Sequence, residues 1–566
     1  METKAASEAA PSTPAVSAPR RPTDRLGGWE ASVFWALVCV HVVPIWAFKH
    51  FPSQDGPAHL DSANVLRLYN RQGHEQFRKY YTINSALVPN WAAHAALAGL
   101  MTVTSPRTAE RLLLTVYVIG LLAAVRYAVR AVSPRAAFVS MLAMPFVYGY
   151  ALHMGFYSFC LGTAMFFFIL GYWIRRSSGM GPGHVLVMAI LAVLALFCHP
   201  IPLTMAAVAV GGGCAWLAAM NLRRDVRAGR FGAVAIWQAI RSRIIGPVVA
   251  LAPAAVLLAM FVARSEGTAD VAGEGAAWRL SALLHLAALA SYRAEELWLS
   301  GAVAFGLAAV TLLVLWDKCR HRRFDRSDGL LLLAVAYTAV FFVVPARMSG
   351  GAFIVIRLSL FPFFAIILWL AAQEWRAVPR IIVQAAAGAV ALAMLAMHAQ
   401  DYSRLNGYLD EYLSAAAHIK AGSTLLPVSF SNTGEGLGMD GASWGVGPYR
   451  HAAGHIAADL DLVNLGNYEA AESHFPIRYR PELDPYAFIG PMEEMGWSSP
   501  RRLDIIGYPR RTGGRIDYVL VWGLLDGPRQ HPNAPDLLRQ LDEAYDPIYT
   551  SPRGLVRLYD RRQSAE

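Results

Sequence analysis

The sequence predicts a polytopic α-helical membrane protein, and three observations support this fold class. Hydrophobic residues make up 55% of the chain and charged residues only 16%, whereas soluble domains carry about a quarter charged residues. Several apolar runs approach or reach the roughly 20 residues that a helix needs to cross a bilayer. They do not show the short alternating segments of a transmembrane β-barrel. We therefore expect about 11 transmembrane helices with outer interfacial helices, plus a C-terminal soluble α/β domain.

Residues 1–28 form a polar segment rich in Ala, Pro and Ser. Such a composition cannot bury enough apolar surface to fold, so we expect a disordered cytoplasmic tail. The first apolar run, 31–48, has no small-residue cleavage site after it. This pattern favours a retained first helix over a cleaved signal peptide.

Basic residues predict how the helices alternate across the membrane. Lys and Arg are retained on the cytoplasmic side, and the dense basic clusters lie at 20–25, 126–135, 175–176, 223–243, 318–326 and 376–380. Placing all of them inside gives a cytoplasmic N-terminus, a transmembrane domain over 29–399 and an extracytoplasmic C-terminal region. The expected helices are 31–48, 112–131, 136–151, 156–174, 184–199, 201–221, 245–263, 296–316, 328–345, 355–372 and 380–398.

This topology makes 49–111 a long outer loop. Segment 91–104 must then stay on the outer side as a short interfacial or re-entrant helix, because it is too short to span. Apolar residues recur at helical spacing in 58–69, which predicts a helix along the membrane surface with Asp61 on its solvated face. A second interfacial helix is expected over 280–290.

The composition changes near residue 400, where charged residues, Pro, Gly and Asn increase. Residues 400–566 therefore read as a soluble domain of mixed α/β type, large enough for its own small core. The segment 414–420 reads as a helix end. Two further segments, 445–455 and 464–469, combine Gly with His, Tyr or Glu. Such a loop suits contact with a sugar or phosphate, but we favour an ordinary turn followed by a helix. The predicted strands are 423–430, 518–522, 547–550 and 555–559.

The stretch Gln54-Asp-Gly-Pro-Ala-His59 follows the first helix directly and is the leading candidate for chemistry. Asp before Gly-Pro is a common helix entry, so Asp55 could cap the helix that begins near Pro57. Capping and catalysis are compatible, and functional acids gather in such loops. His59 lies one turn further and can face the same side as Asp55.

The predicted topology gathers polar residues from separate loops at the outer membrane level. Ionisable groups at bilayer depth usually face a cavity and each other, so we expect a shared cavity. Each residue also has a structural interpretation: His59 as a satisfied interfacial histidine, His199 as a helix cap and the arginines as snorkelling side chains. The candidate catalytic residue is Asp55, and the candidate substrate-binding residues are His59, His153, His199, Arg347 and Arg357.

This set of residues suits a reaction on a lipid phosphate. Arg pairs two phosphate oxygens through its planar fork, and a carboxylate can take a proton from an attacking hydroxyl. Arg and His can stabilise the charge that grows on a leaving phosphate. The prediction is sugar transfer from a polyprenyl-phosphate donor to an acceptor hydroxyl, by one displacement with inversion.

Several other classes lose support. The chain has no P-loop, no Rossmann glycine pattern and no His-Glu-x-x-His motif, which argues against nucleotide-driven transport and zinc proteolysis. No nucleic-acid partner is expected. The main alternative is a non-catalytic membrane carrier or transporter of lipid-linked sugars or polysaccharide, which should show polar or broken helices near the bilayer midplane. A glycan polymer ligase is a third possibility.

The arrangement resembles the GT-C superfamily of integral-membrane glycosyltransferases. Gln54-Asp-Gly-Pro-Ala-His59 is similar to the family's first-loop acid, 153–162 to its second outer loop, and Arg357-Leu-Ser-Leu-Phe-Pro362 to the arginine of a late helix. The resemblance covers the layout of 31–398, with protein mannosyltransferase-like and bacterial lipid-sugar transferases nearest.

This resemblance implies a multi-pass protein of the bacterial inner (plasma) membrane. Its donor would be a polyprenyl-phosphate-linked sugar, and its acceptor a glycan, lipid or protein. The chain departs from the family at the second acid, because His153 and Tyr150 occupy that region. No cofactor is required by the sequence, and a divalent metal is left open. The oligosaccharyltransferase signature Trp-Trp-Asp-Tyr-Gly is absent.

Overall fold

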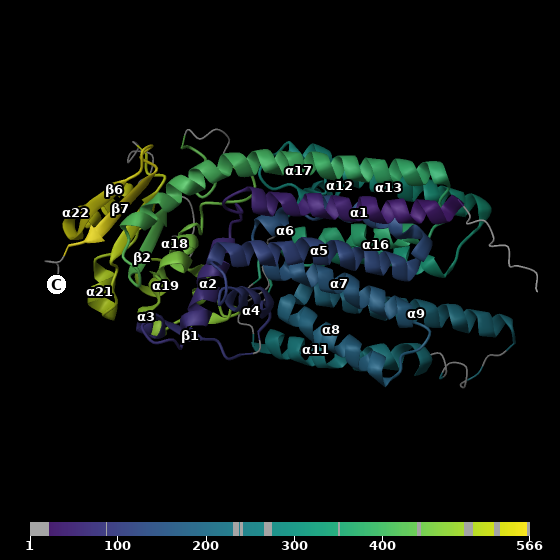
Figure 1. Cartoon of the computed structure of the whole chain (residues 1–566). Helices are drawn as coiled ribbons and strands as arrows, with labels where there is room; N and C mark the ends of the chain where they lie inside the picture. Colours follow the sequence, from purple (N-terminus) through teal and green to yellow (C-terminus); the bar gives the residue numbers. More distant parts are fainter. Residues whose placement is uncertain are drawn as a thin grey trace, which may run out of the picture.

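The computed structural model describes residues 22–86, 88–229, 232, 237, 241–264, 274–348, 351–437, 443–491, 502–525 and 533–562. Within these ranges nine helical segments are long and apolar enough to cross a membrane. They form an elongated bundle, with a smaller strand-containing region at one end (Figure 1). The nine segments comprise α1 (Pro22–Ala47), α5 (Pro106–Val132), α7 (Tyr157–Arg176), α9 (Pro200–Arg227), α11 (Gly246–Arg264), α13 (Glu296–His321), α14 (Gly329–Val343), the pair α15 (Ile354–Leu358) and α16 (Leu360–Ala371), and α17 (Ala377–Leu413).

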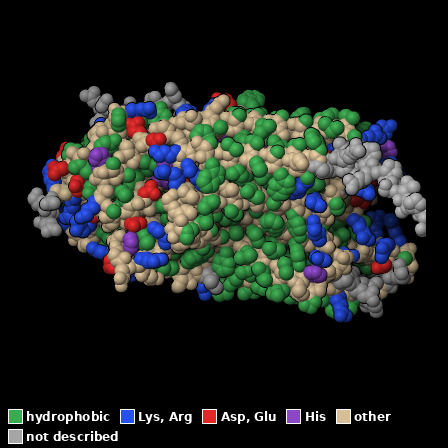
Figure 2. Space-filling model, in the orientation of Figure 1, with side chains coloured by type: hydrophobic (Ala, Val, Ile, Leu, Met, Phe, Trp, Pro, Cys, Tyr) green, Lys and Arg blue, Asp and Glu red, His purple; other side chains and the backbone are tan. Residues whose placement is uncertain are grey.

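The surface of the bundle supports this membrane assignment. Figure 2 shows a broad band of hydrophobic side chains around the bundle, with Lys and Arg gathered towards its two ends. Basic residues occupy the last turns of α7, α9 and α13. We call this the basic end. The opposite end carries Asp55 and is called the Asp55 end.

Two of the predicted spans differ from the sequence expectation. The helix expected over 184–199 is α8 (Pro182–Cys198), with 17 residues. The helix expected over 136–151 is instead a 3₁₀ helix, η1 (Pro134–Phe146), followed by the short α6 (Tyr150–His153). Pro134 and Pro145 remove backbone donors from this stretch. Ala136 has non-helical φ and ψ, so the stretch is kinked near its start.

The segment 49–111, expected to be an outer loop, is largely helical, and its helix α2 is mostly buried rather than at the surface. It contains α2 (Gly56–Leu68), α3 (Glu75–Tyr80), β1 (Tyr81–Ile83) and α4 (Trp91–Leu100). As expected, α4 is short; its ten residues extend about 15 Å. The expectation of a solvated face on α2 is wrong, because Asp61 and Asn64 are fully buried. Asp61 accepts hydrogen bonds from Asn464 and Asn467, so the C-terminal region covers this face.

The other short elements of the bundle connect its spans. The expected helix over 280–290 is present as α12 (Ala276–Leu284) and η3 (Ala287–Leu289). The remaining connections contain η2 (Arg241–Ile245) and η4 (Arg326–Asp328).

The C-terminal region is built on a mixed five-stranded sheet in the order β3-β2-β5-β7-β6. The inner pairings β2–β3 and β2–β5 are parallel, whereas β5–β7 and β6–β7 are antiparallel. All four predicted strands are present. The strands are β2 (Thr424–Ser429), β3 (Val463–Asn464), β5 (Tyr518–Trp522), β6 (Tyr545–Thr550) and β7 (Val556–Arg561). The other elements are η5 (Ser414–His418), α18 (Ala453–Leu460), η6 (Tyr468–Ala471), β4 (Ile477–Tyr479), η7 (Pro481–Leu483), α19 (Pro485–Phe488), α21 (Gly507–Thr512) and α22 (Ala534–Ala544).

The C-terminal region and the membrane bundle are joined in two ways. First, α17 has 37 residues, about 55 Å, and continues from the bundle to Leu413 without a break. Second, β1 from the outer loop pairs with β4, and Phe77 and Tyr81 pack in the same core as Val428 and Val519. The outer loop is therefore part of the C-terminal fold, which places loop and domain side chains in one site.

Candidate functional site

Asp55 is held where two loops meet. It precedes the first residue of α2, and its side chain does not cap that helix. The backbone N–H groups of Gln54 and Asp55 donate to the carbonyls of His153 and Met154, at 2.9 and 3.1 Å. Gly155 completes this junction with φ +83°, and a Cβ atom there would lie 2.6 Å from the nitrogen of Gly56. Only glycine fits such a close approach with a positive φ.

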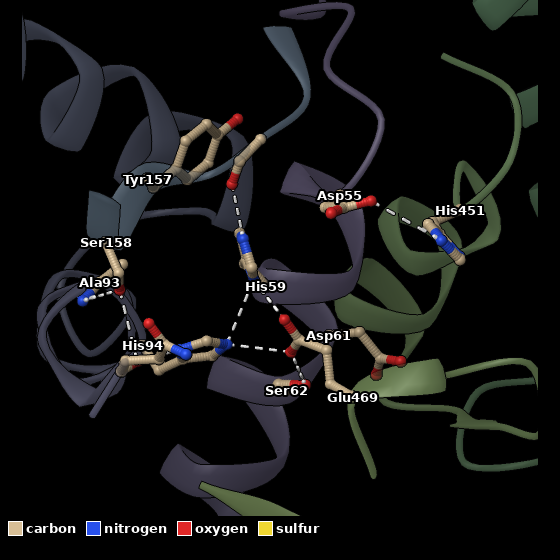
Figure 3. A network of polar contacts seen from close by, with 12 residues as sticks. Asp55, His59, Asp61, Ser62, Ala93, His94, Tyr157, Ser158, His451 and Glu469 are labelled. Atoms are coloured by element: carbon tan, nitrogen blue, oxygen red, sulfur yellow. Dashed lines mark hydrogen bonds and ion pairs between the residues drawn. The ribbon is translucent and has the colours of Figure 1, made fainter. Parts of the chain in front are cut away.

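The Asp55 carboxylate is buried among polar groups from the C-terminal region. Gln54 Nε2 donates to Asp55 Oδ1 at 3.1 Å, and the Gln54 carbonyl oxygen accepts from the Gly447 backbone at 3.1 Å. His451 Nε2 lies 3.7 Å from Asp55 Oδ1 (Figure 3). Tyr468 also hydrogen-bonds this side chain. The segment 445–455, interpreted from sequence as an ordinary turn, therefore contributes to the site.

Burial sets the protonation tendencies around Asp55. It raises the pKa of Asp55, against the opposing effects of His59 and the Gln54 hydrogen bond. Burial also lowers the pKa of His451 well below its usual value, and the charge of Arg450 adds to this effect. A carboxylate with a raised pKa next to a neutral imidazole is suited to accept a proton.

His59 faces away from Asp55 into a second cluster. Its Nδ1 contacts Glu469 Oε1, and His94 Nε2 lies 2.9 Å from Glu469 Oε2 (Figure 3). Ser62 Oγ donates to the same Oε2 at 2.5 Å. Burial opposes charging of His59, but Glu469 outweighs it and raises the pKa of His59 to about 9. Burial likewise opposes charging of Glu469, whereas His94 and His59 lower its pKa below the usual range.

His199 and Arg357 form a third group at the same end of the bundle. His199 caps the start of α9, where its Nδ1 faces the Ile201 backbone N–H at 3.1 Å. Arg357 Nη1 lies 2.9 Å from His199 Nε2, Nη2 donates to the Ala352 carbonyl at 2.7 Å, and Nε has no hydrogen-bond partner. The guanidinium lies 4.1 Å from the centre of the Phe156 ring. Among the described residues, no carboxylate lies within ion-pair distance of it.

The two remaining predicted residues lie apart from these groups. His153 is fully buried, with Nδ1 2.7 Å from Ser291 Oγ and Nε2 2.6 Å from Tyr402 Oη. Both its nitrogens are therefore used within the protein. Arg347 is exposed to solvent. The structure thus gathers Asp55, His59, His199 and Arg357 at one end of the bundle, with His153 behind them and Arg347 at the surface.

An apolar cavity of about 540 Å³ lies beside the charged groups. Tyr150 forms part of its wall, and its hydroxyl interacts electrostatically with both Asp55 and Arg357. Ile356, the residue before Arg357, also lines the cavity. The wall is mainly aromatic and aliphatic, with Trp278, Trp298, Phe353 and Trp444. The cavity is therefore mainly apolar, with Glu274, Ser281 and His285 as its polar lining residues.

Two groups among the described residues could hold a metal ion, and neither contains Asp55. One is His59, His94 and Glu469, and the other is Glu296, His398 and Asp401. In the second group, Glu296 accepts backbone N–H donors at 2.6–3.1 Å, and Asp401 pairs with Arg293 and Arg404. Both arginines contact Asp401 Oδ1, whereas Asp401 Oδ2 and His398 Nδ1 have no hydrogen-bond partner, so protein donors satisfy only part of the second group.

Sequence reasoning missed His94, His451, Tyr468 and Glu469. Each lies in a segment that stood out in the sequence: His94 in the short apolar helix, His451 in 445–455, and Tyr468 and Glu469 in or beside the Asn464–Glu469 turn. The available signal was a histidine or acid in a glycine-containing loop. Such a pattern does not reveal which other segment the residue contacts. Asp55 and His59, for example, lie hundreds of residues away from His451 and Glu469 in the chain.

In comparisons with known proteins, solved structures resemble this chain, whereas sequence comparisons find no match. No family model matches the chain, and no curated protein matches it. Among solved structures, it is similar to the archaeal oligosaccharyltransferase AglB from Archaeoglobus fulgidus, in complex with an inhibitory peptide and a dolichol-phosphate. The identity is 13%, the alignment covers 94% of this chain and 74% of that chain, and the TM-score is 0.42. At this level the likeness carries no functional argument, so function rests on the site itself.

Proposed function

We propose that this protein is a membrane glycosyltransferase. It would move a sugar from a polyprenyl-phosphate donor to an acceptor hydroxyl of a glycan, lipid or protein, with inversion at the sugar carbon. The Asp55 end would face the outer side of a bacterial plasma membrane, with the N-terminus in the cytoplasm. The proposal rests on the buried guanidinium of Arg357. Among the described residues it has no carboxylate within ion-pair distance, although the buried carboxylate of Asp55 lies near enough to attract it.

We interpret Arg357 as the binding site for an anion. Its side chain is only 8% exposed, and burying an unpaired charge is costly. Its contact with His199 offers little compensation. An imidazole has at most one acceptor nitrogen, yet His199 faces two donors, Arg357 Nη1 and the Ile201 N–H. A donor phosphate would supply the missing negative charge and the acceptors that a guanidinium fork matches.

Asp55 would act as the general base of the transfer. Asp55 lies close enough to Arg357 for the two charges to attract each other. Asp55 would take the proton of the acceptor hydroxyl while that oxygen forms its bond to the sugar carbon. The bond from this carbon to the phosphate oxygen breaks in the same step, and its electron pair leaves with the polyprenyl phosphate. Arg357 would stabilise the charge that develops on that phosphate.

The apolar cavity provides room for the lipid part of the donor. The cavity wall connects the proposed lipid site with the charged groups, because Tyr150 borders the cavity and interacts with Asp55 and Arg357. A polyprenyl chain in the cavity would leave its phosphate near Arg357. This arrangement explains why a soluble nucleotide sugar is a poorer candidate for the donor.

A carrier of lipid-linked sugars is the alternative, and the positions of the polar groups do not favour it. Asp55 precedes α2, His199 precedes α9 and Arg357 lies just before α16, so all three are at helix ends. A transporter would place such groups on broken helices near the midplane.

The test is transfer from a radiolabelled polyprenyl-phosphate sugar by the full chain in membranes. The donor to use is the lipid-linked sugar that accumulates when the protein is lost. Asp55→Asn should reduce transfer at least about a hundredfold, since a general base contributes 10²–10⁴-fold. Asp317→Asn, at an exposed acid on α13, serves as the matched control and should retain activity. Full transfer by folded Asp55→Asn would remove Asp55 as the base.

A further inference from the structure

Three side chains from three separate segments meet at one buried point. They are His59 on α2, His94 on α4 and Glu469 on η6, and their side chains are 8%, 1% and 0% exposed. His59 Nδ1 lies 3.2 Å from His94 Nε2, and both nitrogens contact the Glu469 carboxylate (Figure 3). The ligand atoms of all three lie within 4.8 Å of one another.

The outer nitrogens of both imidazoles are already used. His59 Nε2 lies 2.7 Å from the Gly155 carbonyl, and His94 Nδ1 lies 2.9 Å from the Asn90 carbonyl. A carbonyl oxygen only accepts hydrogen bonds, so these two nitrogens carry the protons. In neutral imidazoles the inner nitrogens are then lone pairs. Two lone pairs and a carboxylate therefore face one another, and this arrangement requires a positive charge between them.

A single proton does not satisfy this group. If the proton is on His59 Nδ1, the lone pair of His94 still faces Glu469 Oε2 at 2.9 Å. If it is on His94 Nε2, the lone pair of His59 faces Glu469 Oε1. Protonating both imidazoles places two N–H donors against each other with their nitrogens 3.2 Å apart. One divalent cation removes all three conflicts, because every inner atom is then a ligand.

The ligand set favours zinc, and the spacing of the two imidazole nitrogens fits this ion. Two imidazoles and a carboxylate are ligands typical of Zn²⁺, which binds nitrogen at about 2.0–2.1 Å. Tetrahedral ligands at that distance are about 3.3 Å apart, close to the 3.2 Å between the two nitrogens. The carbonyls behind both histidines provide the second shell that fixes ring orientation in metal sites.

We infer that His59, His94 and Glu469 form a zinc site that fastens the C-terminal region to the outer loop. The site is distinct from Asp55, and it stands whether or not the protein transfers a sugar. Its position has a consequence for Asp55, because His59 lies one turn further along α2. The metal would hold α2, α4 and η6 in place, so that Asp55 stays opposite His451.

The experiment measures metal, not transfer. The full chain is purified in detergent without a metal-affinity tag, stripped with a chelator and titrated with Zn²⁺ alone, and bound zinc is counted by mass spectrometry. We expect one ion per chain. Losing a second-shell group already weakens metal affinity about 10- to 100-fold, so His94→Ala and Glu469→Gln should weaken zinc binding at least about tenfold.

The matched control is His398→Ala, in the second histidine–acid group of the protein. This variant should bind zinc as the unaltered chain does. Equal zinc binding by His94→Ala and the unaltered chain would overturn the proposal, as would loss of zinc in His398→Ala alone.

Zinc absorption spectroscopy on the unaltered chain keeps the proposal testable if the variants fail to fold. It should show two imidazole ligands with nitrogens at about 2.0–2.1 Å and carboxylate oxygen. A spectrum without imidazole ligands, or no bound zinc at all, would also overturn the proposal. Because no sugar donor is present, failure of the zinc site and failure of the proposed transfer are separate results.

Discussion

Two charged groups at the Asp55 end are equally buried but differ in how their charges are balanced. Glu469 faces two imidazoles and a serine hydroxyl, so its oxygens have partners within the protein. Arg357 faces an imidazole, one carbonyl and aromatic rings, and its Nε has no hydrogen-bond partner. In the first group, each carboxylate oxygen contacts a protein side chain. The second group keeps a buried donor without an acceptor.

The largest expected effect is on the stability of the Glu469 group. Glu469→Ala removes the only carboxylate between His59 and His94, and breaking a buried charged pair costs on the order of 3–5 kcal/mol. Thermal unfolding in detergent should show a clearly lower midpoint. An unchanged midpoint would mean that Glu469 does not join the C-terminal region to α2.

Arg357 should behave in the opposite way. Arg357→Met replaces an unpaired buried charge with an apolar side chain, so the protein should keep its stability or gain about 1 kcal/mol or more. Arg279→Met is the matched control, because Arg279 is also buried but donates to the carbonyls of Glu274, Phe341 and Val344. That control should lose stability. If both variants lose stability equally, the contrast between the two groups fails.

The affinity for the lipid-linked donor tests the proposed function of Arg357. Arg357→Ala should raise the KM for the polyprenyl-phosphate donor about tenfold or more, since hydrogen bonds to a charged group contribute about 1.5–3 kcal/mol. Arg357→Lys should recover part of that loss, because the charge remains while the planar fork is gone. Unchanged KM in both variants would reduce Arg357 to a snorkelling side chain.

The smallest effect concerns pH. Asp55 acts as a base only when ionised, and burial raises its pKa above the usual 3.8. Transfer should therefore decline as pH falls through this raised pKa, at a higher pH than for an exposed aspartate. The profile of kcat/KM against pH checks this, with the acid limb expected to shift in Asp55→Glu. A profile that stays flat down to about pH 4 would contradict the role of Asp55 as base.

Local patterns allowed parts of this protein to be predicted closely. The strands β2, β5, β6 and β7 follow from short runs rich in β-branched and aromatic residues, and the spans α5, α7 and α13 follow from apolar length. Asp55 could be singled out because it directly follows an apolar helix, in a loop of the kind where functional acids gather. These features are encoded by neighbouring residues, so no tertiary information is needed.

Other parts depended on contacts that no local pattern contains. The periodicity of α2 predicted a solvated face, yet Asp61 is covered by Asn464 and Asn467. The helical pattern of 136–151 gave way to a 3₁₀ helix that packs within the bundle. His153 looked like a cavity residue, but Ser291 and Tyr402 use both of its nitrogens.

By itself, the sequence determined the membrane class, most of the spans and the main strands, and it singled out Asp55 as a candidate, because hydrophobic length and residue type act locally. Only the tertiary structure decided which strands pair and which side chains contact one another. It paired β1 with β4, brought Glu469 between His59 and His94, and left Arg357 without an acid beside it. The physical reason is that the energy of a buried charge depends on what packs against it, and here the packing partners come from distant parts of the chain.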